Sequence, residues 1–281
     1  MDGATFLVLI GCASATALLN CALKHQADPL TGALMLAICG GASAMPLLIL
    51  TGLPSAESMP LLAVSVLLAL LYWIFLGKAY ESGEVSIVFP LAYGSAPAIV
   101  LLMTCLFINE VPSANQLSVI LLISAGLLLV LFSGTGLPAL ANRRMLAHCA
   151  ALVAVICGYT IIDALGARLS GSALAYTAAI YAGNSIATLA YGVFRHRERL
   201  VRAAASSWRP AIFWGAASMF IYSGELWAMT RAPIALVAAL RESSILFAAV
   251  FAILWLKEPL RPSRIAGAGV VALGLMVMRL A

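Results

Sequence analysis

Residues 86–107 read SIVFPLAYGSAPAIVLLMTCLF, a stretch of 22 residues without one charged side chain. About 20 apolar residues in a helix cross the roughly 30 Å hydrocarbon layer of a bilayer, so this stretch predicts a transmembrane helix. The whole chain has the same character, since 63% of its 281 residues are hydrophobic and 10% are charged. Soluble domains carry about 25% charged residues and expose much of their surface to water. The composition predicts an integral membrane protein and excludes a soluble enzyme, a nucleic-acid binder and a disordered chain.

Ten apolar segments, separated mostly by prolines, glycines and charges, predict an all-α protein with ten transmembrane helices. The segments are residues 3–23, 30–50, 60–80, 86–107, 114–133, 146–165, 173–194, 210–229, 234–255 and 263–280. No Lys or Arg precedes the first segment, so it lacks the basic region of a signal peptide. We therefore expect it to remain in the mature protein.

The basic residues predict the orientation. Connectors after odd-numbered segments hold twelve Lys and Arg, whereas the even connectors and the two ends hold three, Arg168, Arg231 and Arg279. Because cytoplasmic loops are enriched in Lys and Arg, we expect the odd connectors in the cytoplasm and both termini outside. The expected location is the bacterial inner (plasma) membrane, with the lipid bilayer as partner. The basic connector 195–209 acts in this reading as an orientation signal, and the alternative is a surface helix that meets anionic headgroups.

The chemistry-bearing residues give little support for an enzyme. Six cysteines lie in or beside apolar segments without a C-x-x-C pair, and three histidines lack the spacing of metal ligands. We expect no metal and no cofactor, and interpret the cysteines as small hydrophobic residues. The nucleotide-binding pattern G-x-x-x-x-G-K-S/T is missing from the sequence, so ATP is not expected to drive the protein directly. The ionisable residues deep in the segments are Arg and Glu without His, which disfavours a membrane enzyme.

The chain contains an internal repeat. A shift of 148 places residues 78–127 over 226–275 without a gap, and the hydropathy profile repeats. TALLNCALKH also lies over YTIIDALGAR, which aligns Asn20 with Asp163. Each half holds five segments, an odd number, so the second copy must enter the membrane in the opposite direction. Inverted repeats are typical of secondary transporters, whose site lies near the midplane between the two halves.

Two runs of sequence carry a common set of marks. Residues 79–129 read AYESGEVSIVFPLAYGSAPAIVLLMTCLFINEVPSANQLSVILLISAGLLL, with an aromatic-x-x-Gly-Glu-x-Ser turn, a proline-rich helix and a Glu-x-Pro exit; residues 231–279 repeat the pattern with KEP at the exit. Together with LLNCALK (18–24), where Leu19 replaces a common Trp, these runs resemble the EamA domain of the drug/metabolite transporter (DMT) superfamily. The resemblance implies ten transmembrane helices as two inverted five-helix repeats, 3–135 and 145–281, around a central cavity. It also implies a small-molecule substrate, without naming it.

Three charged residues mark the candidate site. Glu225 lies six residues before Arg231, and Arg241 and Glu242 lie eight and nine after Pro233. At about 1.5 Å per residue they lie about 9–13.5 Å deep, close to a midplane about 15 Å in, where charge is costly and marks function. Arg241 suits the anionic end of a substrate, and Glu225 or Glu242 an amine or a proton. As helical neighbours, Arg241 and Glu242 are expected to point about 100° apart without neutralising each other.

The alternative is a structural ion pair of Arg241 with Glu225 or Asp163. Six further residues complete the predicted substrate-binding set, each with an alternative role in packing, in snorkelling or in hydrogen bonding to connector backbone. They are Tyr93, Lys78, Tyr222, Trp227, Asp163 and Asn20. Glu110 and Glu258 are expected to cap the helices that follow them. Ala268-x-x-x-Ala272 predicts close packing of the last segment against the fifth segment or a second subunit, so a monomer and a homodimer both stay open.

The sequence thus favours a secondary active transporter, either a permease or an exporter. Its expected substrate is a small polar metabolite, zwitterionic or anionic, such as an amino acid or an aminophosphonate. The expected mechanism is alternating access with proton coupling. The alternatives are a flippase for a lipid-linked substrate and a non-transporting membrane scaffold.

Overall fold

The computed structural model describes residues 1–23, 29–83, 85–132, 142–254 and 262–280, and every regular element in these ranges is helical. The prediction of an all-α protein is thereby confirmed. The α-helices are α1 (Gly3–Leu23), α2 (Pro29–Thr51), α3 (Met59–Ser82), α4 (Val85–Met103), α5 (Ala114–Phe132), α6 (Arg143–Leu169), α7 (Ala173–Met229), α8 (Ile234–Arg241), α9 (Ser244–Leu254) and α10 (Pro262–Leu280). A short 3₁₀ helix, η1 (Ala56–Ser58), precedes α3, and a π-helical turn, η2 (Thr104–Ile108), ends α4.

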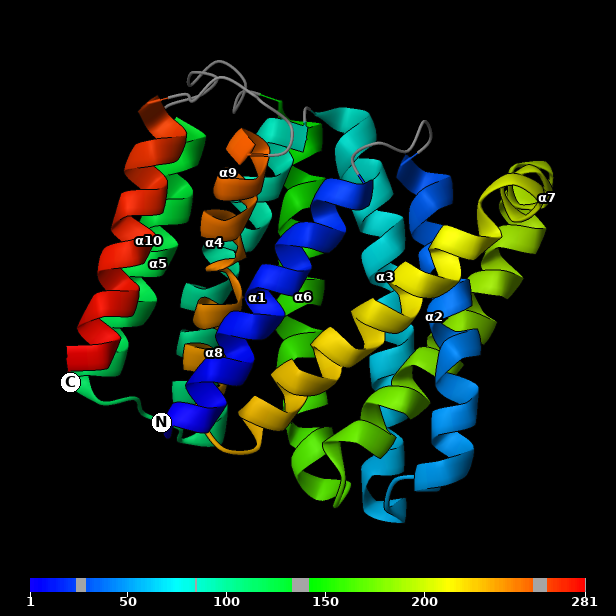
Figure 1. The fold of residues 1–281 in the computed structure, drawn as a ribbon, viewed down its shortest axis with the longest axis horizontal. Coiled ribbons are helices and arrows are strands. Elements are labelled where there is room, and N and C mark those ends of the chain that lie inside the picture. Colours follow the sequence, from blue (N-terminus) through cyan, green and yellow to red (C-terminus); the bar gives the residue numbers. More distant parts are fainter. Residues whose placement is uncertain (24–28, 84, 133–141, 255–261, 281) are drawn as a thin grey trace.

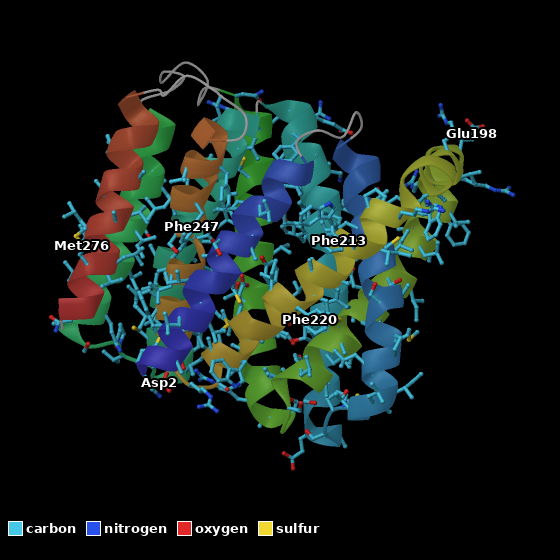
Figure 2. All side chains as sticks on the ribbon, in the orientation of Figure 1. Asp2, Glu198, Phe213, Phe220, Phe247 and Met276 are labelled. Carbon is cyan, nitrogen blue, oxygen red and sulfur yellow. The ribbon has the colours of Figure 1, made fainter. Side chains whose placement is uncertain are left out.

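The surface of the bundle is apolar between two polar ends. Four stretches in the described residues are long and apolar enough to cross a membrane: Leu34–Thr51, Ala56–Ser82, Leu91–Ile108 and Arg143–Leu169. Phe213, Phe220 and Met276 project from the sides of the bundle, whereas Glu198 and Asp2 lie at opposite ends (Figure 2). Because lipid tails solvate such apolar sides, the chain is an integral membrane protein with several crossings.

Helix α7 folds back on itself. Its 57 residues would extend about 85 Å if straight, but Figure 1 shows that the helix climbs to one end of the bundle and returns. The hydroxyls of Tyr181 and Ser218, 37 residues apart in sequence, lie 2.7 Å apart. The two predicted segments 173–194 and 210–229 are therefore two arms of one bent helix, and Pro210 does not end it.

Helix α2 lies between the two arms of α7, and glycines on both sides allow this. A Cβ atom on Gly41 would lie 2.1 Å from Cβ of Ser185 on the first arm. A Cβ atom on Gly215, on the second arm, would lie 2.5 Å from the backbone nitrogen of Gly40. At both contacts the helix backbones approach too closely for any side chain at the glycine position.

Helices α5 and α10 run side by side at one edge of the bundle (Figure 1). Gly126 of α5 fits against Gly267 and Val271 of α10, and Gly274 of α10 fits against Ile123 of α5. The face of α10 that packs is therefore Gly267, Val271 and Gly274. The predicted face Ala268-x-x-x-Ala272 is wrong by one residue, because Val271 and Gly274 are buried whereas Ala268 and Ala272 are partly exposed. The contact with the fifth helix is present.

The predicted segment 234–255 is broken into α8 and α9, with the break at Glu242 and Ser243. Glu242 has ψ −9°, and its N–H bonds to the carbonyl of Ala239, three residues back instead of four. Ser243 bonds to Leu240 in the same way. The break therefore falls on the charged residues of the candidate site.

Candidate functional site

Arg241 lies between two carboxylates. Its Nε donates to Oε1 of Glu242 at 3.2 Å, and Nη1 lies 3.7 Å from Oε2 of Glu225. The three side chains come from the end of α8, from the helix break and from the second arm of α7. Their exposed fractions are 11% for Arg241, 4% for Glu225 and 6% for Glu242. The structure therefore brings all three predicted residues into one buried cluster.

The contact between Arg241 and Glu242 corrects the expectation that these neighbours stay apart. That expectation assumed a regular α-helix through both residues, with 100° between successive side chains. The three-residue hydrogen bonds at Glu242 and Ser243 change the backbone path there, so the two side chains meet. The pairing of Arg241 with Glu225 is the ion pair predicted above as the structural alternative to substrate binding.

A third carboxylate lies nearby. Tyr222 of α7 donates a hydrogen bond of 2.5 Å to Oδ2 of Asp163 on α6, and Ser65 of α3 lies beside the same carboxylate. Asp163 is buried within α6 and binds a side chain, so the alternative of a hydrogen bond to connector backbone is wrong for this residue. Asp163 and the charged cluster both interact with Tyr159, so three acids and one guanidinium lie in the same region.

Tyrosines surround the charged cluster. Tyr159 of α6 interacts electrostatically with Arg241, and its ring meets that of Tyr72 at 6.0 Å. The hydroxyls of Tyr72 and Tyr93 are hydrogen-bonded, which connects α3 with α4. Tyr181 packs beside Tyr222, with ring centroids 6.3 Å apart.

Tyr72, Tyr159 and Tyr181 were not predicted from the sequence to lie near the site. Tyrosine is enriched at the membrane interface, where its hydroxyl reaches water. All three lie well inside the predicted segments 60–80, 146–165 and 173–194. A tyrosine far from both ends of a segment needs a polar partner inside the protein, and this signal could have found them.

Two predicted residues stay outside the cluster. Lys78 is exposed on α3, with Nζ 5.7 Å from the ring of Phe75. Trp227 stacks under the guanidinium of Arg231 at 4.4 Å, near the end of α7. The side chain of Asn20 lies outside the described residues, as does Glu258.

A cavity of about 570 Å³ opens between the end of α6 and both ends of α7. Ligand pockets in proteins have volumes of this size. The lining includes Arg168, Arg231, Ser223 and Trp227, whereas the three charged cluster residues do not contribute to it. In the described part of the chain, no three His, Cys, Asp or Glu side chains are arranged to hold a metal ion.

Glu110 connects the two halves of the chain at the same end of the bundle. Its Oε2 accepts the N–H of Ile234, the first residue of α8, at 2.9 Å, and Oε1 binds Nη2 of Arg168 at 3.0 Å. The expected cap is therefore present on α8 instead of on α5, the helix that follows Glu110. A carboxylate at a helix N-terminus is stabilised by the helix dipole. Arg168 also donates to the carbonyls of Met229 and Ala232.

Replacing Glu110 with alanine is expected to lower the free energy of unfolding by about 1.5–3 kcal/mol, because two hydrogen bonds to a charged group are lost. The thermal unfolding midpoint of the purified protein in detergent measures this effect. Glu57→Ala is the matched control, since Glu57 is exposed on η1. Equal midpoints for the two variants would contradict the assigned role of Glu110.

Apolar helices around a buried charged cluster are typical of one class of protein, the multi-pass membrane transporters. Residues 145–280 match the model of the EamA-like transporter family, a domain of the DMT superfamily, and this match confirms the sequence resemblance. The match indicates a membrane transporter of this superfamily.

The fold has solved relatives. Among 29 matching chains of solved structures, one described as "Crystal structure of protein" aligns with 100% of this chain and 98% of its own, at a TM-score of 0.79 and 14% identity. At this identity the likeness shows the fold alone. No curated protein matches the chain in sequence.

Proposed function

We propose that the protein is a secondary active transporter of a small zwitterionic metabolite that carries an amine and an anionic group, such as an amino acid or an aminophosphonate. The observation that carries this proposal is the buried cluster of Arg241 with Glu225 and Glu242 at a break between two helices. Discontinuous helices with ionisable groups at the break form the substrate and ion sites of many secondary transporters.

The charges of the cluster favour a zwitterion. One guanidinium faces Glu225 and Glu242 directly, and Asp163 lies close by, so carboxylates exceed cations. An amine or a proton would balance this excess. The planar guanidinium of Arg241 would exchange one of its carboxylate partners for the anionic end of the substrate. The same exchange gives a route for coupling, because a carboxylate released from Arg241 in a buried site favours binding of a proton.

Two inverted repeats, 3–135 and 145–281, are the architecture we propose for alternating access. Helices α1 and α6 begin at opposite ends of the bundle (Figure 1). The contact of Gly126 with Val271 and the contact of Gly274 with Ile123 exchange under the shift of 148 residues. Such an exchange is expected of two copies related by a two-fold axis in the membrane plane. We place the protein in the inner membrane with both termini outside, on the charge count of the connectors.

The test is uptake of labelled amino acids and aminophosphonates into proteoliposomes that contain the purified protein, with and without a pH gradient. Wild type is expected to show uptake that the gradient accelerates. Glu225→Gln, which keeps the shape of the side chain, is expected to reduce uptake at least tenfold and to remove the effect of the gradient. Glu198→Gln is the control, because Glu198 is exposed at the turn of α7 (Figure 2). Equal uptake by Glu225→Gln and Glu198→Gln would refute the proposed site.

A further inference from the structure

The cavity lies at the end of the bundle that carries the N-terminus. It is lined by basic residues that have no role in the proposed transport mechanism. The even connectors and ends of the chain hold three basic residues, and two of them, Arg168 and Arg231, line this one cavity. Arginine is thus scarce at this end but concentrated at the cavity.

Each arginine is held in position by neighbouring groups. Nε and Nη2 of Arg168 bind the carbonyls of Met229 and Ala232 and the carboxylate of Glu110, which fixes the plane of the guanidinium. Arg231 lies over the ring of Trp227 at 4.4 Å, a cation–π contact that restrains the side chain. Two restrained guanidinium groups therefore border the same space.

One residue of the cavity wall has a buried hydroxyl without a partner among the described residues. Ser223 is 7% exposed, and its Oγ has no hydrogen-bond partner among the described residues. Buried hydroxyls are normally paired, so the hydroxyl of this wall residue is free to donate to a ligand that reaches it. Beside it the first turn of α7 contributes Ser172, Ala173 and Leu174 to the wall. The first N–H groups of a helix have no partner within the helix and favour anions.

We propose that this cavity binds an oxyanion, the phosphate or carboxylate group of a small soluble molecule or of a lipid headgroup. Arg231 and Arg168 supply the positive charge, and Ser223 with the N-terminus of α7 supplies the neutral donors. The acid that opposes Arg231 is Asp2, which precedes α1 and interacts electrostatically with this arginine. Hydrogen bonds from Thr5 lower the pKa of the Asp2 carboxyl, so Asp2 is ionised at neutral pH and competes with the bound anion. The proposal concerns binding and does not depend on the transported substrate.

The experiment titrates inorganic phosphate against the full chain in phosphatidylcholine nanodiscs at constant ionic strength and follows the thermal unfolding midpoint, because a ligand of the folded state raises it. Phosphate is expected to raise the midpoint of wild type. Arg231→Gln and Ser223→Ala are each expected to weaken the apparent affinity about tenfold, as the loss of one charge-assisted or buried hydrogen bond predicts. Asp2→Asn keeps a residue suited to cap α1 and is expected to strengthen binding.

Arg209→Gln is the matched control, because Arg209 is an exposed arginine that also lies over a neighbouring ring, Trp208, at 5.3 Å. It is expected to bind phosphate like wild type. No shift of the wild-type midpoint, or equal shifts for Arg231→Gln and Arg209→Gln, would overturn the proposal. Nanodiscs of phosphatidylglycerol separate the two sources of the anion. A wild-type midpoint raised by this lipid alone, with no further response to phosphate, assigns the site to a headgroup, and a retained response assigns it to a soluble anion.

Discussion

Replacing Arg241 with methionine is expected to destabilise the folded protein by about 3–5 kcal/mol, because Glu225 and Glu242 are then buried without their cation. Methionine keeps most of the side-chain volume, so packing changes little. The thermal unfolding midpoint and the yield of monodisperse protein in detergent measure the loss. Arg209→Met removes an exposed arginine and is expected to leave both unchanged.

A rescue variant tests whether the loss of stability comes from uncompensated charge or from packing. Adding Glu225→Gln and Glu242→Gln to Arg241→Met removes both uncompensated carboxylates, and most of the lost stability is expected to return. If Arg241→Met alone is as stable as wild type, the ion pairs contribute nothing to folding. If the triple variant is no better than the single one, the loss comes from packing and not from charge.

Replacing Gly215 with alanine is expected to prevent the assembly of α2 with α7. The added Cβ would lie 2.5 Å from the nitrogen and 2.8 Å from Cα of Gly40, and backbone atoms have no rotamer with which to move aside. Overpacking of this kind costs 1–3 kcal/mol or more, typically by shifts of whole helices. Size-exclusion profiles of the solubilised protein should show loss of the folded peak.

Gly269→Ala is the control for this variant. A Cβ on Gly269 meets no atom within 4 Å, and alanine favours a helix over glycine by about 1 kcal/mol. The same substitution is therefore expected to be neutral or stabilising on α10 and disruptive on α7. A folded Gly215→Ala variant with wild-type stability would mean that the contact between α2 and the second arm of α7 is looser than described.

The helical segments were predictable because each depends on local composition. The first segment, 3–23, coincides with α1, and 30–50 differs from α2 by one residue at each end. The break at Glu242 was not predictable, since no proline or glycine marks it. Proline and glycine were the signals used for helix ends, and Pro210 shows their limit, because α7 continues through it. Tertiary packing determines both the break at Glu242 and the continuation of α7 through Pro210. The sequence of a single segment carries no information on that packing.

The candidate site was predicted in part. Depth along the segment identified Glu225, Arg241 and Glu242, and the structure places them together. The arrangement of their charges was wrong, because it depended on the backbone at a break that was not foreseen. The partner of Glu110 was missed for a related reason, since Ile234 is distant in sequence and only the fold brings it near. Whether these residues bind a substrate stays a prediction.

The glycine contacts on both sides of α2 limit how the molecule can change shape. Because the backbone of α2 touches both arms of α7, these three helical segments pack as one body, and sliding between them would break the contacts. The contacts of α5 with α10 form a second such body at the opposite edge (Figure 1). Relative motion is then left to the helices between them, and the break between α8 and α9 is a place where the α-helical hydrogen-bond pattern is already interrupted. Arg241 and Glu242 lie at this break. A hinge at that point would therefore move about the same residues whose charges form the cluster.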